Sequence, residues 1–307
     1  MVKSFNYKEK AIRSTKTFAV LGLLNGALVW GLIWYPMRLL QGHGVSAEMT
    51  SFLIYLVAWV LGSAFFWRAY TDFSRHWKAL LLIGFSAGWV NLAYGLALVH
   101  GEVMRVLLLF YLAPLWTVLL ARLMLDEVLT RYGYAVIALS LGGALTMLKQ
   151  PGVFFPIPQN GPEWLGLSAG IAFAWTNVLS RRHAGLSLPS KSLAVSIGVM
   201  TLALLVVLWR PAQVVELTAV GESDVLLLLA LGLTVWIATV TVQYGLRWVP
   251  SNQAIVILLF ELVVAAVSSY WLTDEALTMQ EWIGAMMIIA ASIFSGKLEA
   301  RPDGIKS

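Results

Sequence analysis

One acidic side chain lies inside an otherwise apolar run of the sequence. Glu261 sits near the middle of the run Asn252–Leu272, and no Lys or Arg occurs within two helical turns of it. If this run crosses a bilayer, a charged carboxylate at its centre costs about 2.5–3.5 kcal/mol. Glu261 is therefore expected to face a cavity, to be protonated, or to pair with another segment. It is interpreted as a cation-binding or proton-coupling carboxylate, or alternatively as a neutral acid hydrogen-bonded between helices.

Tyr111 is the residue that matches Glu261 in the first half of the chain. It lies 150 residues earlier, directly after Val106–Phe110, which matches Val256–Phe260 at the same offset. We expect both side chains near the same midplane site. Pro114, three residues on, lies on the same helical face and removes one backbone hydrogen bond, which frees a carbonyl near Phe110. The resulting break is interpreted as a hinge, a ligand acceptor or a static packing kink.

Further polar and aromatic side chains fall within other apolar runs. Asn91 and Tyr94 share one helical face, and Trp236, Thr239 and Gln243 share another. Because polar groups at membrane depth point inward, these residues line a cavity or join helices. Trp side chains can also form an aromatic box for a planar or cationic ligand, although interfacial belts hold many of them. The candidate substrate-binding residues are Glu261, Tyr111, Tyr94, Asn91, Trp30, Trp34, Trp175, Asn177 and Gln243.

The sequence offers little for catalysis or metal binding. It contains no Cys, and its four histidines are expected in loops, two on each side, so no metal site is predicted. No Gly-rich phosphate loop is present, so any active transport must draw on a gradient. Gly84–Gly88 resembles a hydrolase elbow, but it lies in an apolar run and is interpreted, like Gly22/Gly26 and Gly166/Gly170, as a helix-packing face. We expect no catalytic residue, no cofactor and no nucleic-acid partner.

The elements that carry these residues are predicted to be membrane helices. The chain of 307 residues is 59% hydrophobic and 12% charged, against about 25% charged in soluble domains. About 20 apolar residues span the hydrocarbon core of a bilayer. Ten runs qualify, of which the fifth and tenth are short: Phe18–Leu40, Ser46–Trp67, Trp77–Val99, Glu102–Leu125, Tyr132–Leu148, Pro162–Leu179, Leu188–Trp209, Ser223–Leu246, Asn252–Leu272 and Glu281–Phe294.

The basic residues predict the orientation of these helices. With the N-terminus in the cytoplasm, 17 of the 21 Lys and Arg residues fall on the cytoplasmic side and 4 on the other. Adding or removing one helix in the middle would spoil this division, so it supports ten helices with both termini inside. The predicted organisation is a basic segment (1–17), a five-helix repeat (18–149), an external linker (150–161), a second repeat (162–296) and a cytoplasmic tail (297–307).

The two halves are predicted to be inverted repeats. Tyr94-Gly95-Leu96 matches Tyr244-Gly245-Leu246, and Asp126-Glu127 matches Asp274-Glu275 after a two-residue gap. Because each half has an odd number of helices, the second must be upside down relative to the first. Inverted repeats are typical of transporters, in which a central site opens alternately to each side. The expected fold is therefore an all-α membrane protein of ten transmembrane helices in two inverted five-helix repeats.

These residues resemble the drug/metabolite transporter superfamily, specifically its ten-helix EamA type, over roughly residues 18–297. The motifs that carry the resemblance are Trp30-Gly31, Leu109-Phe110-Tyr111-Leu112-Ala113-Pro114, Leu125-Asp126-Glu127, Ala174-Trp175-Thr176-Asn177-Val178-Leu179-Ser180-Arg181-Arg182 and Asp274-Glu275. The resemblance implies a central cavity lined mainly by helices one, three, four, six, eight and nine. It also implies export of amino acids or related metabolites, and structural roles for the paired acidic residues.

The predicted function is that of a secondary transporter that exports small organic metabolites, such as amino acids or aromatic or cationic compounds, by alternating access. The alternatives are a multidrug or organic-cation exporter and a membrane-embedded enzyme. An enzyme of that kind places acid and base clusters at one interface, whereas the predicted cytoplasmic loops here are short. We expect the lipid bilayer, a small-molecule substrate and protons as partners, function as a monomer, and a location in a bacterial inner membrane.

Overall fold

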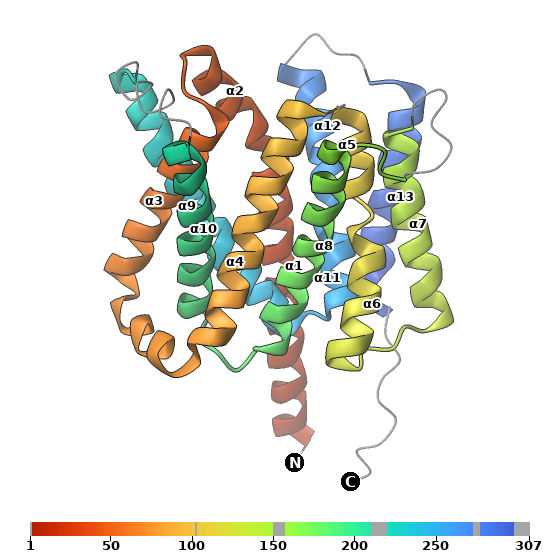
Figure 1. The fold of residues 1–307 in the computed structure, drawn as a ribbon. Coiled ribbons are helices and arrows are strands. Elements are labelled where there is room, and N and C mark those ends of the chain that lie inside the picture. Colours follow the sequence, from red (N-terminus) through yellow and green to blue (C-terminus); the bar gives the residue numbers. More distant parts are fainter. Residues whose placement is uncertain (1, 102, 150–156, 210–219, 273–276, 298–307) are drawn as a thin grey trace.

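The computed structural model describes residues 2–101, 103–149, 157–209, 220–272 and 277–297 of the chain. The regular elements in these ranges are all helices, packed side by side as a bundle (Figure 1). They are α1 (Val2–Leu32), α2 (Trp34–Gly42), α3 (Ala47–Phe65), η1 (Trp67–Ala69), α4 (Tyr70–His100), α5 (Val103–Phe110), α6 (Ala113–Leu125), α7 (Arg131–Met147), α8 (Gly161–Arg182), α9 (Leu188–Trp209), α10 (Glu222–Trp248), α11 (Ser251–Leu258), α12 (Phe260–Leu272), α13 (Met279–Phe294) and η3 (Ser295–Lys297). Each predicted apolar run is thus largely helical.

Short polar side chains fix where several helices begin. Ser46, Thr130, Asn160 and Thr278 accept hydrogen bonds from the backbone N–H three residues on, at the starts of α3, α7, α8 and α13. Such caps satisfy a backbone donor that has no partner within the helix. In the sequence, each of these residues lies at the start of a predicted apolar run or at most three residues before it. Two histidines differ from the prediction: His76 and His100 lie in α4 rather than in loops, because this helix extends beyond the apolar run.

Three of the predicted runs are broken into two helices. The first is interrupted at Ile33, between α1 and α2. The other two breaks correspond between the halves of the chain: α5 and α6 have 8 and 13 residues, and α11 and α12 also have 8 and 13 residues. In Figure 1 the α5–α6 pair descends through the bundle while the α11–α12 pair rises through it. The two broken helices therefore run in opposite directions, as an inverted repeat requires.

Helices α4 and α9 pack along a seam of small residues. A Cβ added to Gly84 would lie 2.5 Å from the carbonyl oxygen of Ala194, and one added to Gly88 would lie 2.5 Å from that of Gly198. Gly198 in turn packs directly on the backbone of Gly84. Backbone-to-backbone approach of this kind requires glycine. The Gly84–Gly88 segment is therefore a packing face inside a helix, and not the strand–turn–helix of a hydrolase elbow.

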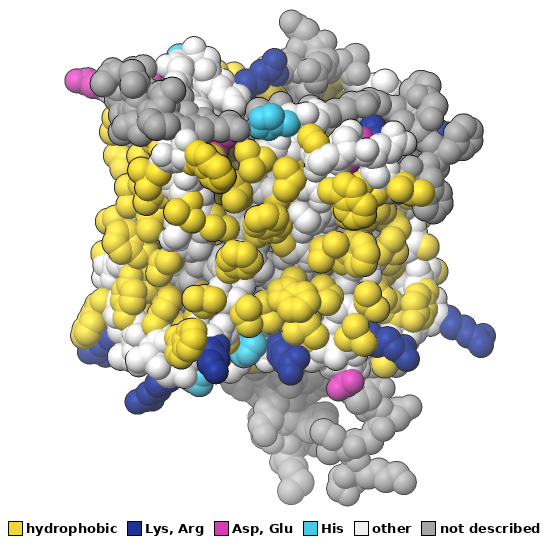
Figure 2. All heavy atoms as spheres, viewed as in Figure 1, with side chains coloured by type: hydrophobic (Ala, Val, Ile, Leu, Met, Phe, Trp, Pro, Cys, Tyr) yellow, Lys and Arg dark blue, Asp and Glu magenta, His cyan; other side chains and the backbone are white. Residues whose placement is uncertain are grey.

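The outside of the bundle is apolar. Figure 2 shows a broad band of hydrophobic side chains, with Lys and Arg side chains gathered along its lower edge. Among the described residues, seven helices or broken helices are long and apolar enough to cross a membrane, and α13 is a shorter apolar helix. Leu123, Trp209 and Ile293 are each at least 70% exposed, as expected for side chains that face lipid rather than water. The protein is an integral, multi-pass membrane protein.

Candidate functional site

The two residues at the breaks of the corresponding helices contact each other. Tyr111 follows the last residue of α5, and Glu261 lies in the first turn of α12. The hydroxyl of Tyr111 donates a hydrogen bond to Oε1 of Glu261 at 3.0 Å. Tyr111 is 8% exposed, so this carboxylate–phenol pair lies in the protein interior. The structure therefore brings together the two residues that the sequence repeat placed at equivalent positions.

Pro114 explains the break in the first of these helices. It lies in the first turn of α6, where a missing N–H is tolerated. The chain bridges the break with a hydrogen bond from Leu112 N to the carbonyl of Leu109 at 3.4 Å, a tighter turn than that of an α-helix. The neighbouring carbonyl of Phe110 faces Gly170 of α8, where an added Cβ would lie only 2.5 Å from it. The helix break is therefore packed directly against the backbone of α8.

Aromatic rings surround the Tyr111–Glu261 pair. The ring centroids of Tyr94 and Phe110 are 4.7 Å apart, and those of Phe110 and Phe173 are 5.7 Å apart. Phe110 also contacts Tyr111 edge-on at 5.1 Å. A cavity of about 10 Å³ remains beside Glu261, lined in part by Tyr111 and Phe173. It has room for about one water molecule, so in this conformation it has no space for a metabolite.

Three other predicted residues lie elsewhere around this core. Trp30 of α1 and Asn91 of α4 both meet the hydroxyl of Tyr55 in α3. Trp34, at the start of α2, donates from Nε1 to Ser268 Oγ of α12 at 3.0 Å. The Trp34–Ser268 contact joins the two halves of the chain, and the contacts to Tyr55 join helices of the first half. In this conformation Trp30, Trp34 and Asn91 therefore make interhelical contacts, one of the two roles considered for such side chains.

The remaining three predicted residues do not join the Glu261 site by any described contact. Asn177 and Gln243 are each 3% exposed, and Nδ2 of Asn177 and Oε1 of Gln243 have no hydrogen-bond partner among the described residues. Buried polar atoms without partners are costly, which makes these two amides candidates for contact with a ligand or water. Trp175 is 37% exposed. Partial exposure of that ring agrees poorly with a place in an enclosed aromatic box.

Two residues, one at the Glu261 site and one in contact with Trp30 and Asn91, were missed by the sequence reasoning. Phe173 is an apolar side chain in an apolar helix, so its type carried no signal. Tyr55 is different, because its hydroxyl is a polar group at the centre of the second apolar run, and that alone marks it for an inward position. Tyr55 is 5% exposed in the structure. The same rule that selected Tyr94 would have selected Tyr55.

Glu127 joins three elements at the end of the bundle where basic residues gather. Its Oε2 accepts a hydrogen bond from the N–H of Ser251 at 3.0 Å, at the start of α11. Its Oε1 lies 3.6 Å from Nε of Arg181, and Nη1 of Arg181 donates to the carbonyl of Arg247 at the end of α10. Asp126 ends α6 in the left-handed conformation, with φ 55°. The first acidic pair therefore has structural roles, while Asp274 and Glu275 lie outside the described residues.

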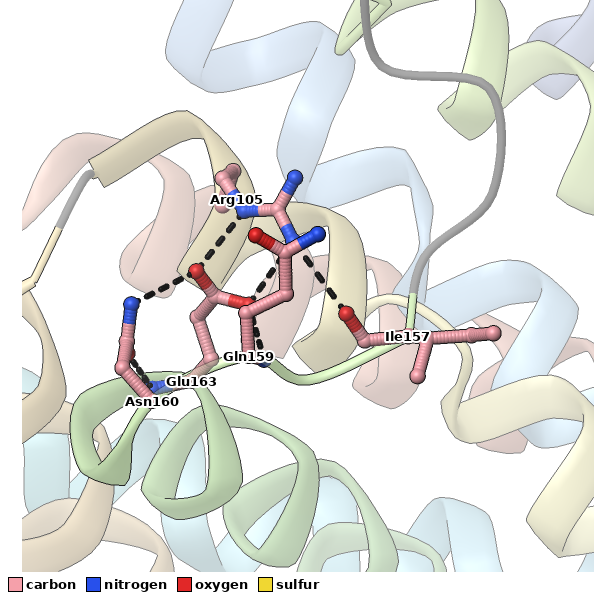
Figure 3. Close-up of polar contacts among 5 residues, drawn as sticks. All are labelled: Arg105, Ile157, Gln159, Asn160 and Glu163. Atoms are coloured by element: carbon pink, nitrogen blue, oxygen red, sulfur yellow. Dashed lines mark hydrogen bonds and ion pairs between the residues drawn. The ribbon is translucent and has the colours of Figure 1, made fainter.

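A second charged cluster lies at the other end of the bundle. Nε and Nη2 of Arg105, in α5, donate to the two carboxylate oxygens of Glu163, in α8, at 2.7 and 2.9 Å (Figure 3). Asn160 and the N–H of Gln159 also donate to this carboxylate. The Arg105 and Glu163 side chains are 12% and 2% exposed. A bidentate, buried ion pair of this kind fixes geometry strongly.

The described residues contain no group of three or more His, Asp or Glu side chains that could hold a metal ion. The described polar groups of the Glu261 site are instead the carboxylate and the hydroxyl of Tyr111, with aromatic rings beside them at two broken helices. Broken helices that meet at the middle of a bundle, with a polar group between them, define the substrate region of many membrane transporters.

The comparisons with known proteins agree with this architecture. The model of the EamA-like transporter family matches the chain twice, at residues 17–149 and 162–296. The chain belongs to the EamA-like transporter family, within the drug/metabolite transporter superfamily, and consists of two repeats. Family members are transporters and not enzymes.

The search of solved structures adds a likeness in fold. One chain with a crystal structure, titled only "Crystal structure of protein", has a TM-score of 0.70 at 19% identity. The match covers 90% of this chain and 97% of that one. No curated protein matches the chain.

Proposed function

We propose that this protein is a secondary transporter that exports small organic metabolites by alternating access, with Glu261 as its cation-binding or proton-coupling group. The observation that carries the proposal is the hydrogen bond from Tyr111 to Glu261, made where the two corresponding broken helices meet. The carboxylate of Glu261 is held by a single hydrogen bond from the Tyr111 hydroxyl. It can give up this bond and instead take up a proton or bind the ammonium group of a substrate. The aromatic rings favour a substrate that is an amino acid or another compound with a cationic or aromatic part.

The proposed topology follows from the basic residues. Ten membrane spans with both termini in the cytoplasm place the described basic cluster around Arg181 inside and Arg105 outside. The two halves, residues 18–149 and 162–296, would then form two inverted repeats. We propose that a single chain is functional, because both halves of the pathway lie in it, and that the protein resides in a bacterial inner membrane.

The small cavity beside Glu261 implies that the helices around it move during transport. Its volume of about 10 Å³ accommodates one water molecule but no metabolite. Substrate binding therefore requires the helices around the breaks, α5–α6 and α11–α12, to separate. Opening on one side at a time would expose Glu261 first to one compartment and then to the other.

A multidrug or organic-cation exporter is the second candidate function, and the same aromatic cluster favours it. The two candidates differ in the range of compounds transported. The test is transport into proteoliposomes with an imposed pH gradient, using a panel of labelled amino acids and organic cations. We compare the wild type with Glu261→Gln and with Glu222→Gln, a matched change at an exposed carboxylate.

The expected result is gradient-driven transport that is lost in Glu261→Gln and retained in Glu222→Gln, with substrate exchange preserved in both. Transport of few related compounds supports a metabolite exporter, and transport of many unrelated ones supports the second candidate. Equal gradient-driven flux in the wild type and Glu261→Gln would reduce Glu261 to a structural acid and defeat the proposal. Absence of flux for every compound would reopen the alternative of a membrane-embedded enzyme.

A further inference from the structure

A groove of about 510 Å³ opens between the α3–α4 connection and the start of α9. Its walls include Phe65, Trp67, Arg68, Asp72 and Ser187. The volume is in the range of pockets that hold a small molecule. It is also far larger than the cavity of about 10 Å³ beside Glu261.

The groove is separate from the proposed transport site. None of its lining residues borders the cavity at Glu261, and none belongs to α5, α6, α11 or α12. In Figure 1 the connection from α3 to α4 lies at the lower periphery of the bundle, away from α11 and α12. The groove therefore faces the surroundings of the protein. A ligand of the groove would come from the surrounding membrane or solvent and not from the transport pathway.

The groove lining carries one positive and one negative side chain, Arg68 and Asp72. The Arg68 guanidinium is exposed, stacks over the Trp67 ring at 5.2 Å, and has no acidic partner within the described chain. Asp72 is the acidic residue of the lining, and its Oδ2 already accepts from Ser187 Oγ at 2.8 Å and Ser190 Oγ at 2.5 Å. The carboxylate is thus held by two hydroxyl donors. Arg68 remains as the group with unused donors, in a geometry suited to phosphate.

The other walls of the groove suit an acyl chain. Phe65 is 68% exposed and Trp67 is 65% exposed, although both are large and apolar. Phe65 is held in place by stacking on Trp236 at 5.5 Å between ring centroids. Trp residues are typical of the level at which lipid head groups meet the hydrocarbon core. The groove therefore combines a cationic fork and an aromatic wall at the basic edge of the apolar band (Figure 2).

We propose that this groove binds one anionic phospholipid from the leaflet on the basic side of the protein. Its phosphate lies on Arg68, and the first part of an acyl chain lies against Phe65 and Trp67. Basic pockets between membrane helices on this side are suited to acidic head groups. This inference does not depend on the proposed transport function.

The test is native mass spectrometry of the full-length protein in detergent, titrated with phosphatidylglycerol or with phosphatidylcholine of the same acyl chains. The variants are Arg68→Gln and Arg75→Gln, the latter a matched loss of an exposed Arg outside the groove lining. Trp67→Ala tests the aromatic wall. Inorganic phosphate is added as a competitor in a separate titration.

We expect one saturable phosphatidylglycerol per protein, with a Kd about tenfold lower than for phosphatidylcholine. Arg68→Gln and Trp67→Ala should each raise that Kd at least about fivefold, and Arg75→Gln less than twofold. If Arg68→Gln cannot be purified, Arg68→Lys replaces it, with an expected rise of about threefold because the charge stays and the fork is lost.

Three results would overturn the inference. Equal affinity for the two lipids would mean that the groove does not select an acidic head group. Equal effects of Arg68→Gln and Arg75→Gln would indicate diffuse attraction to the basic surface and no built site. Displacement of phosphatidylglycerol by inorganic phosphate at similar concentration would show a site for free phosphate, to which the acyl chain contributes nothing.

Discussion

Tyr111 and Glu261 stand 150 residues apart and hydrogen bond to each other at 3.0 Å. Each lies at the break of the fourth helical unit of its half, and the helices that flank the two breaks have the same lengths, 8 and 13 residues. A pseudo-twofold relation brings equivalent positions together only near its axis. The contact therefore places the axis of the repeat beside this carboxylate, where an opening on either side would reach it equally.

Removal of the Tyr111 hydroxyl should impair transport. In Tyr111→Phe the ring stays and the carboxylate of Glu261 loses its donor. Hydrogen bonds to charged groups contribute about 1.5–3 kcal/mol, so we expect gradient-driven flux in proteoliposomes to fall at least about tenfold. Tyr132→Phe is the matched control, because its hydroxyl donates to the carbonyl of Phe294 on the exposed side of the bundle. Equal flux in the two variants would contradict the role given to Tyr111.

Gly170 should be intolerant of even one added carbon. A Cβ there would lie 2.5 Å from the carbonyl oxygen of Phe110. Overpacking of this kind costs about 1–3 kcal/mol, so Gly170→Ala should lower the melting temperature of the protein in detergent. Gly95→Ala is the control, because no atom lies within 4 Å of its added Cβ. That helix-interior change should raise stability by about 0.5–1 kcal/mol, and a loss from it would contradict the described packing.

The Arg105–Glu163 pair should show strong energetic coupling. Both side chains are largely buried, at 12% and 2% exposed, so removal of one leaves the other without compensation at a cost of about 3–5 kcal/mol. We expect Arg105→Ala and Glu163→Ala each to lower the melting temperature strongly, and the double variant to be less harmful than the sum of the two. A double-mutant cycle of unfolding measures this coupling. If the losses of the two single variants simply add in the double variant, the ion pair in Figure 3 contributes little to stability.

Asp126 should matter for its backbone and not for its charge. It is exposed and ends α6 with φ 55°, a conformation that glycine adopts freely and β-branched residues do not. Asp126→Gly should be neutral or slightly stabilising, whereas Asp126→Val should cost about 1–2 kcal/mol. Thermal unfolding of the two variants in detergent checks this order. Equal losses in both would assign the role to the carboxylate instead.

The sequence predicted the helices well because their apolar runs and caps are local features. It also predicted the first central break, since Pro114 cannot complete the hydrogen bonds of a continuous helix. The corresponding break at Leu259 carries no such signal, because α11 and α12 contain no proline. Only the repeat, read together with Pro114, points to it.

The sequence repeat also predicted part of the candidate site. The repeat offset paired Tyr111 with Glu261, and polarity at depth selected Tyr94. The rings that complete the site depend on tertiary packing: Phe173 reaches it from α8, and nothing in its local sequence distinguishes it from the other apolar residues there. Trp175, two residues further along, was selected for its type but is 37% exposed. Phe173 and Trp175 lie on different faces of α8. Residue type alone does not tell which face points toward the site.

The glycine seam between α4 and α9 joins one half of the chain to the other. Its backbones touch at Gly84, Gly88 and Gly198 without side chains between them. Because no side chains interdigitate across this contact, the two helices can stay closely packed while they slide or rotate slightly against each other. In the proposed alternating-access cycle, this contact would allow the two halves to rotate against each other. Spin labels placed close to the seam should keep a constant separation in every state, while labels placed far from it should report the full travel.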